Sequence, residues 1–126
     1  MKYVCLAYEE EAKLNALAKT EWDALRAETL AYVEKLRAMG VLLTAEPLQT
    51  VRTAATVRVR QGKVSITDGP FVETKETLGG FFLIQVRNRE EALKVAAEWP
   101  SARLGTIEVR PIEEGLPQDQ RYAQQP

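Results

Sequence analysis

The residues with the clearest chemical potential lie in one stretch, Asp68 to Val86, with the sequence DGPFVETKETLGGFFLIQV. Its first three residues, Asp-Gly-Pro, are a strong turn signal, and Asp68 would either cap that turn through backbone N–H bonds, which we favour, or act as a base in an apolar cleft. Glu73 and Lys75 are two residues apart, so an extended chain places them on one face. They would form a surface ion pair there, or clamp a small polar ligand.

Other polar side chains are expected to converge with this stretch. Tyr8 ends an apolar strand near the N-terminus, and Glu108 and Arg110 lie on the last strand. We therefore predict a ligand site formed by Tyr8, Asp68, Glu73, Lys75 and Arg110, with Asp68 as its one catalytic candidate and a small anion as its ligand.

Several kinds of chemistry are disfavoured by what the chain lacks. It has one cysteine and no histidine, so it has few ligands for zinc and no side chain that ordinarily titrates near neutral pH. It also contains neither a P-loop nor a G-x-G-x-x-G motif. We predict no metal site and no cofactor, and we lean against an enzyme.

Composition favours a cytoplasmic globular protein. Apolar residues make up 45% of the 126, and 17 basic against 18 acidic side chains give a net charge of −1, which argues against a general nucleic-acid binder. No apolar stretch is long enough to span a membrane, and the first residues do not resemble a signal peptide. Arg52, Arg58 and Arg60 suggest a solvated sheet surface more than an anion-binding wall.

Hydrophobic periodicity predicts an α+β domain over residues 1–112 and a polar tail over 113–126. A main helix is expected from a Thr20 cap to Gly40, with Trp22 and Tyr32 packed in the core, and a second helix from Asn88 to Trp99. A hairpin is expected about Gln61-Gly62, with its valines facing inward. Strands are expected at 2–8, 41–44, 53–60, 63–67, 81–86 and 104–111.

Two features of the predicted strands have further consequences. The glycines at 79 and 80 precede a buried strand, where they indicate a bulge or a close approach of backbone or ligand. Strands 2–8 and 81–86 are apolar on both faces, whereas two helices with short connections cover only one face of a sheet. The other apolar face needs a partner, and we therefore predict a homodimer with two-fold symmetry.

The Asp68–Ile84 stretch resembles the signature of the YCII-related proteins, in their DGPF-domain branch. The segments MKYVCLAY, LRAMGVLL, VRVRQGKVSITDGP and ARLGTIEVRPI follow the family order and extend the resemblance over residues 1 to 112. The resemblance implies a ferredoxin-like subunit that dimerises through its sheet as a dimeric α+β barrel. Some members are proposed to use an Asp–His pair, which would match Asp68 here, but Leu104 stands where the histidine is expected.

Three functions follow from the residues and the resemblance. We favour a small-molecule-binding or regulatory module with a cleft beside the DGPF motif, and the resemblance also allows an association with sigma factors. The alternatives are a lyase or isomerase that uses Asp68, and a subunit whose main role is assembly.

Overall fold

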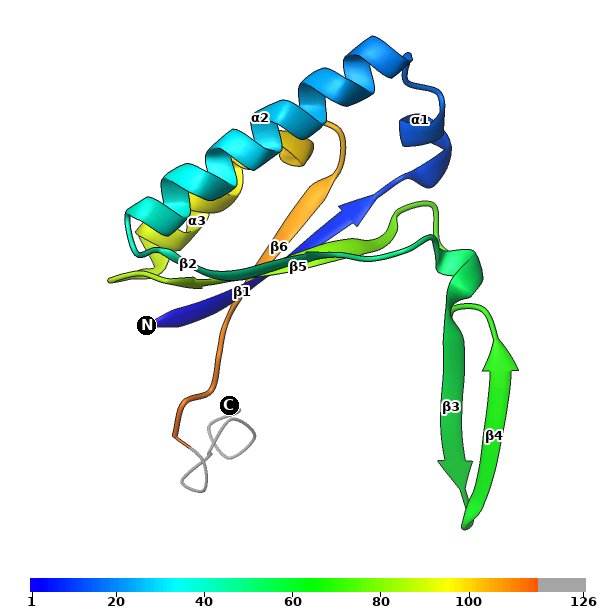
Figure 1. Cartoon of the computed structure of the whole chain (residues 1–126). Coiled ribbons are helices and arrows are strands. Elements are labelled where there is room, and N and C mark those ends of the chain that lie inside the picture. The colour runs from blue at the N-terminus through cyan, green and yellow to red at the C-terminus, as the bar shows by residue number, and fades with distance from the viewer. Residues whose placement is uncertain (116–126) are drawn as a thin grey trace.

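The computed structural model describes residues 1–115, so most of the predicted tail, from residue 116 onward, lies outside the described residues (Figure 1). None of the helices in the described part is long and apolar enough to cross a membrane. The elements follow one another as β1 (Lys2–Glu9), α1 (Glu11–Asn15), α2 (Lys19–Ala38), β2 (Leu42–Pro47), η1 (Val51–Thr53), β3 (Ala55–Arg60), β4 (Lys63–Asp68), β5 (Thr77–Gln85), α3 (Arg89–Ala97), η2 (Pro100–Arg103) and β6 (Thr106–Pro111).

Four strands form one antiparallel sheet in the order β2-β5-β1-β6, and β3 pairs only with β4 in a separate hairpin. Without that hairpin the succession is β-α-β-β-α-β, which is the ferredoxin-like arrangement. Helices α2 and α3 both cover the same face of the sheet (Figure 1). The predicted α+β fold with an antiparallel sheet and two main helices on one face is confirmed.

The core lies between this sheet face and the helices. Phe82 and Ile84 of β5 and Cys5 of β1 are 1% exposed or less, and Trp99 stacks on Phe82 with ring centroids 3.9 Å apart. Burial of each such large side chain contributes roughly 1.5–3 kcal/mol to folding before entropy is subtracted. Burial also raises the pKa of the Cys5 thiol to about 12, which keeps it protonated and unreactive.

The main helix begins two residues earlier than predicted. Ala18, not Thr20, is the N-cap, and the Glu21 carboxylate accepts a hydrogen bond of 2.9 Å from the Ala18 backbone N–H. This one-way contact needs only a carboxylate three residues into the helix and the backbone N–H of the cap residue, so alanine suffices at the cap. The predicted end is confirmed, because Gly40 takes a positive φ of 72°.

The predicted apolar stripe of α2 packs at its centre and not at its start. Val33 and Leu36 are buried, and the Tyr32 hydroxyl donates to the Val95 carbonyl at 2.9 Å. Trp22, however, is 46% exposed. The core assignment is thus confirmed for Tyr32 and wrong for Trp22, since the first turns of α2 extend beyond the residues packed on the sheet.

The β3–β4 hairpin turns at Gln61-Gly62 as predicted, with positive φ at both residues. It does not join the sheet but projects away from it as a two-stranded ribbon (Figure 1). Val57 and Val59 are therefore 62% and 56% exposed, and the prediction that they face inward is wrong for the single chain. The predicted alternation of apolar and polar residues along the strands is correct, but it does not show what packs against the apolar side.

Within residues 1–115, no helix covers the second face of the sheet (Figure 1). Val4 and Leu6 of β1 lie opposite Leu83 and Phe81 of β5, and all four are only partly buried. We call this surface the open face. It matches the prediction that both of these strands have two apolar sides.

Candidate functional site

A cavity of about 520 Å³ lies between α2 and the sheet. This volume falls within the range of small-molecule sites, and most of its walls are apolar, as such sites usually are. The lining includes the second half of the predicted motif, from Gly79 to Phe82. The other lining residues are Ala7, Glu9, Leu14, Trp22, Leu25, Arg26, Thr29, Leu30, Val33, Arg37, Ala45, Glu46, Pro47, Trp99 and Ser101.

Both tryptophans of the chain line this cavity, and their surroundings differ. Trp99 is fixed by its stack on Phe82 and by an edge contact with Tyr32, whose ring centroid is 5.9 Å away. Trp22 is almost half exposed on the first turns of α2. One indole is therefore a rigid wall, and the other is accessible to a ligand that covers it.

Glu9 is the acidic group with the most unusual environment in this cavity. It ends β1 on the same face as Ala7, because alternate strand residues point to the same side. Partial burial, and next the nearby negative charge of Glu11, raise the pKa of the Glu9 carboxyl above its ordinary value. A carboxyl of this kind can accept a hydrogen bond from a ligand, or hold a proton that an ordinary glutamate would already have released.

The two motif glycines make room for this arrangement. The pairing of β1 with β5 shifts between Ala7 and Tyr8 and leaves Gly79 as the bulged residue, with the Glu9 carboxylate directly where its Cβ would be. At Gly80 a Cβ would lie 2.9 Å from the Glu46 carbonyl oxygen of β2. The prediction of a bulge or a close backbone approach at this pair is confirmed.

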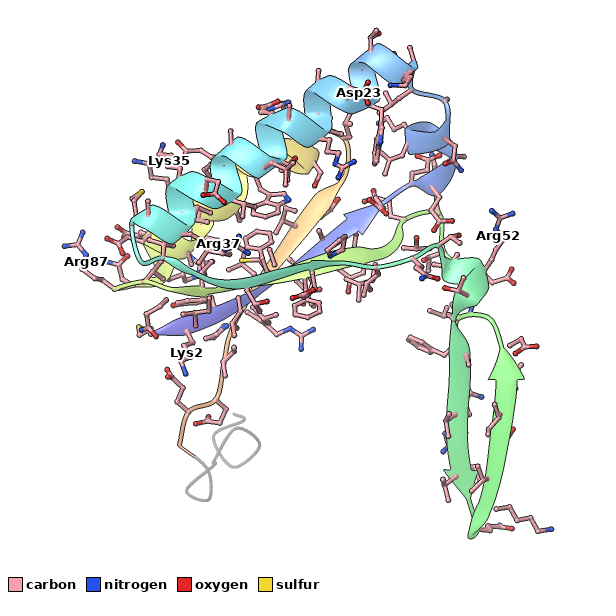
Figure 2. All side chains as sticks on the ribbon, viewed as in Figure 1. Lys2, Asp23, Lys35, Arg37, Arg52 and Arg87 are labelled. Atoms are coloured by element: carbon pink, nitrogen blue, oxygen red, sulfur yellow. The ribbon has the colours of Figure 1, made fainter. Side chains whose placement is uncertain are left out.

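Glu11, the neighbour that acts on Glu9, is itself held in place. Its carboxylate accepts hydrogen bonds of 2.9 Å from the Thr50 hydroxyl and from the Val51 backbone N–H. Beside these residues lies a second, more polar hollow of about 480 Å³, which shares Glu9, Leu14 and Trp22 with the first cavity. Its remaining lining residues are Glu11, Asn15, Leu17, Lys19, Thr50 and Arg52, of which the last points outward from η1 (Figure 2).

Three of the predicted site residues lie away from this cavity. Asp68 ends β4, Glu73 and Lys75 follow in the segment between β4 and β5, and all three are exposed. The Gly69 N–H donates to the Ala54 carbonyl at 2.7 Å, which extends the pairing of β3 with β4 by one residue. None of the three lines the cavity, and their role in a ligand site stays a prediction.

The other two predicted residues belong to the open face. Tyr8 lies on β1 opposite Thr106, and Arg110 lies opposite Val4, with its guanidinium 2.7 Å from the Glu108 carboxylate. This contact, which is mainly a hydrogen bond, raises the pKa of Arg110. The sheet thus brings Tyr8, Glu108 and Arg110 to one surface, and it separates them from the exposed motif residues of the same chain.

Leu104, at the expected histidine position, caps the end of η2 and does not line either cavity. Its neighbour Arg103 forms a two-pronged contact with Glu28 of α2, at 2.7 and 2.8 Å. This segment therefore fastens η2 to α2.

The sequence reasoning missed Glu9 and Trp22, which lie on the walls of the cavity. The first strand was predicted over residues 2–8, which ends one residue before Glu9, and Trp22 was predicted to pack in the core. One signal was available for Glu9, since it continues the alternation of Cys5 and Ala7 and so points to the helix-covered face. For Trp22, the helical periodicity shows which side of α2 faces the sheet. It does not show how far along α2 the sheet extends.

Residues 1–115 match the family described as YCII-related domain. The chain is 36% identical over 114 residues to the uncharacterized protein R00369 of Rhizobium meliloti (strain 1021), covering 89% of this chain and 92% of that protein. Its fold is similar to that of 5-chloro-2-hydroxyhydroquinone dehydrochlorinase (TftG) from Burkholderia phenoliruptrix AC1100, solved in complex with 2,5-dihydroxybenzoquinone. The TM-score is 0.57 at 16% identity, over 94% of this chain and all of that one, which supports the shared fold alone. By its sequence, the chain belongs to the YCII-related domain family.

Proposed function

We propose that the protein binds a small, flat and largely apolar molecule in the cavity under α2. The observation that carries this proposal is the combination of a cavity of about 520 Å³, two tryptophan walls and the partly buried carboxyl of Glu9. Flat ligands gain from contact with aromatic side chains, and a single polar group in an apolar cavity fixes their orientation. The cavity borders the second half of the DGPF motif and not its first residues.

The ligand should carry a hydrogen-bond donor directed at Glu9. Arg26 and Arg37 also line the cavity, and each brings a positive charge that suits an acidic group elsewhere on the same ligand. The structural neighbour was solved with a dihydroxylated six-membered ring, which supports a ring of this size as a starting probe. Hydroxylated aromatic acids and hydroxyquinones are the classes to screen first.

Isothermal titration calorimetry with such a panel tests the proposal, and tryptophan fluorescence provides a second readout because both indoles line the cavity. Glu9→Gln should weaken the binding of donor-bearing ligands about tenfold or more, since a charge-assisted hydrogen bond contributes ~1.5–3 kcal/mol. Glu10→Gln is the matched control, because this neighbouring carboxyl lines neither hollow. Equal weakening by both variants, or no binding by any member of the panel, would contradict the proposal.

A second candidate function is proton transfer on the bound ligand, with Glu9 as the acid or base. The raised pKa of this carboxyl favours it over exposed Asp68, which ends β4 away from the cavity. In an enzyme of this kind Glu9→Gln abolishes turnover while ligand binding is retained in part, and Asp68→Asn leaves turnover unchanged. The reverse pattern would restore Asp68 as the catalytic candidate.

We further propose that the protein works as a cytoplasmic homodimer joined through its open face. The support is the apolar character of Val4, Leu6, Phe81 and Leu83 on a sheet surface without helices. A second copy of the same surface would cover these side chains about a two-fold axis. Light scattering at micromolar concentration should give twice the mass of the chain, and Leu83→Lys should give the mass of one chain.

A further inference from the structure

We propose that the β3–β4 hairpin, residues 55–68, is a dimerisation arm whose apolar face docks on a second copy of the chain. The inference rests on the proposed homodimer and is independent of the proposed ligand cavity. It assigns a partner to the one long element of the described chain that packs on nothing of its own (Figure 1).

One face of the arm is an uncovered apolar ladder. Val57 lies directly opposite Ile66, and Val59 lies opposite Val64, so the four branched side chains share one side of the ribbon. Their exposed fractions are 62%, 69%, 56% and 65% in that order. Clusters of exposed branched side chains of this kind mark surfaces that bind a partner.

The other face of the arm is polar and basic. It carries the cross-strand pairs Thr56 with Thr67, Arg58 with Ser65, and Arg60 with Lys63. A two-stranded hairpin on its own is marginally stable in water, and packing of one face is what stabilises it. The division of the ribbon into one apolar and one charged face shows which side is suited to docking and which to water.

The position of the arm identifies the occupant as a second copy. The ribbon leaves the end of the sheet and projects on the side opposite α2 and α3, which is also the side of the open face (Figure 1). A copy stacked on the open face by a two-fold axis would therefore lie alongside the arm. The same axis places the arm of that copy alongside the first chain, so one contact covers both arms and both sheet faces.

The size of the surface supports the same conclusion. The open face is formed only by alternate residues of four strands, whereas a stable interface uses about 20–30 residues from each partner. Residues 55–68 supply much of the difference. Phe71 and Val72, 74% and 49% exposed just beyond the arm, extend its apolar surface.

The first half of the DGPF motif then has a structural role at the base of the arm. Gly69 takes a φ of 97°, its N–H bonds to the Ala54 carbonyl, and its own carbonyl accepts the Thr56 hydroxyl at 2.8 Å. These bonds close the foot of the ribbon and set the direction in which it leaves the body. Asp68 lies at this foot, opposite Ala55 and on the apolar side of the ribbon.

The test compares two substitutions on adjacent residues of β4. Ile66→Lys places a charge in the apolar ladder, and Thr67→Lys places the same charge on the polar face. By light scattering across a dilution series, Ile66→Lys should raise the dimer dissociation constant at least a hundredfold, while Thr67→Lys should leave it within about threefold. An unchanged dimer in Ile66→Lys would overturn the proposal and leave the sheet-to-sheet dimer standing.

A second measurement does not depend on a destabilising charge. A photo-crosslinking amino acid at position 66 should join two chains covalently upon illumination, and the same group at position 67 should not. Crosslinking from neither position, or equally from both, would contradict docking of the apolar face. A wild-type chain that is monomeric would overturn both the arm and the dimer, while calorimetric ligand titration would still decide the cavity separately.

Discussion

The carboxylate of Glu9 rests against the Cα atom of Gly79, in the space that any other side chain at position 79 would fill. Glu9 ends one central strand of the sheet, and Gly79 is the bulged residue of its neighbour. The bulge therefore does more than accommodate a kink. It leaves a recess that holds a carboxyl at the edge of an apolar cavity and partly shields it from water.

This contact predicts a specific coupling between the two residues. Gly79→Ala should lower the free energy of unfolding by at most about 1 kcal/mol, because the added methyl group displaces the Glu9 carboxylate, which is the far end of a flexible side chain. In a Glu9→Ala background the same substitution should cost much less, since the overlapping group is absent. Chemical denaturation of the four proteins in this double-mutant cycle measures the coupling. Additive effects would show that Gly79 is needed for its backbone alone.

The raised pKa of Glu9 predicts how stability depends on pH. The folded state favours the protonated carboxyl, so its contribution is complete below the ordinary value of 4.5 and is lost as the pH rises through the higher folded pKa. Relative to Glu9→Gln, the wild type should therefore lose stability as the pH rises from the ordinary value of 4.5 through the higher folded pKa. Melting temperatures of both proteins across this window give the difference, in which the other carboxyl groups cancel. A difference that is constant with pH would contradict a raised pKa.

Much of the fold could be predicted because local sequence signals agree with it. Alternation in β1 and β5, the helix end at Gly40 and the turn at Gln61-Gly62 each depend on residues close in sequence. The start of the main helix was misplaced because Thr20, with Asp23 three residues later, forms only a weak capping-box pattern. The contact that forms instead is the equally local one between Glu21 and the Ala18 backbone N–H. Neighbouring residues that could serve as the N-cap differ only by small free energies, so sequence preference alone does not decide between them.

The site was less predictable because it depends on which surfaces meet. The two halves of the motif lie in different environments: Gly79 to Phe82 line the cavity, and Asp68 lies at the foot of an exposed hairpin. The sequence pattern of β3 and β4 shows an apolar side without showing what covers it. Glu9 and Trp22 line the cavity because of where α2 crosses the sheet. That position depends on tertiary packing, which no local sequence pattern reveals.

Alanine substitutions of the two tryptophans should affect the stability of the fold to very different degrees. Trp99 is 8% exposed and stacked on Phe82, so Trp99→Ala should lower the free energy of unfolding by roughly 3–5 kcal/mol. Trp22 is 46% exposed, and Trp22→Ala should change it by less than about 1 kcal/mol.

For ligand affinity, in contrast to stability, the exposed Trp22 should matter. Trp22→Ala removes an accessible wall of the cavity and should weaken the binding of a flat ligand about fivefold to thirtyfold, because one aromatic contact is worth ~1–2 kcal/mol. Calorimetric titration of the folded variant measures this loss, and Leu93→Ala provides a control, since Leu93 is also an exposed apolar residue on a helix but does not line the cavity. If Trp22→Ala binds as tightly as the wild type, the ligand does not occupy the space beneath the start of α2.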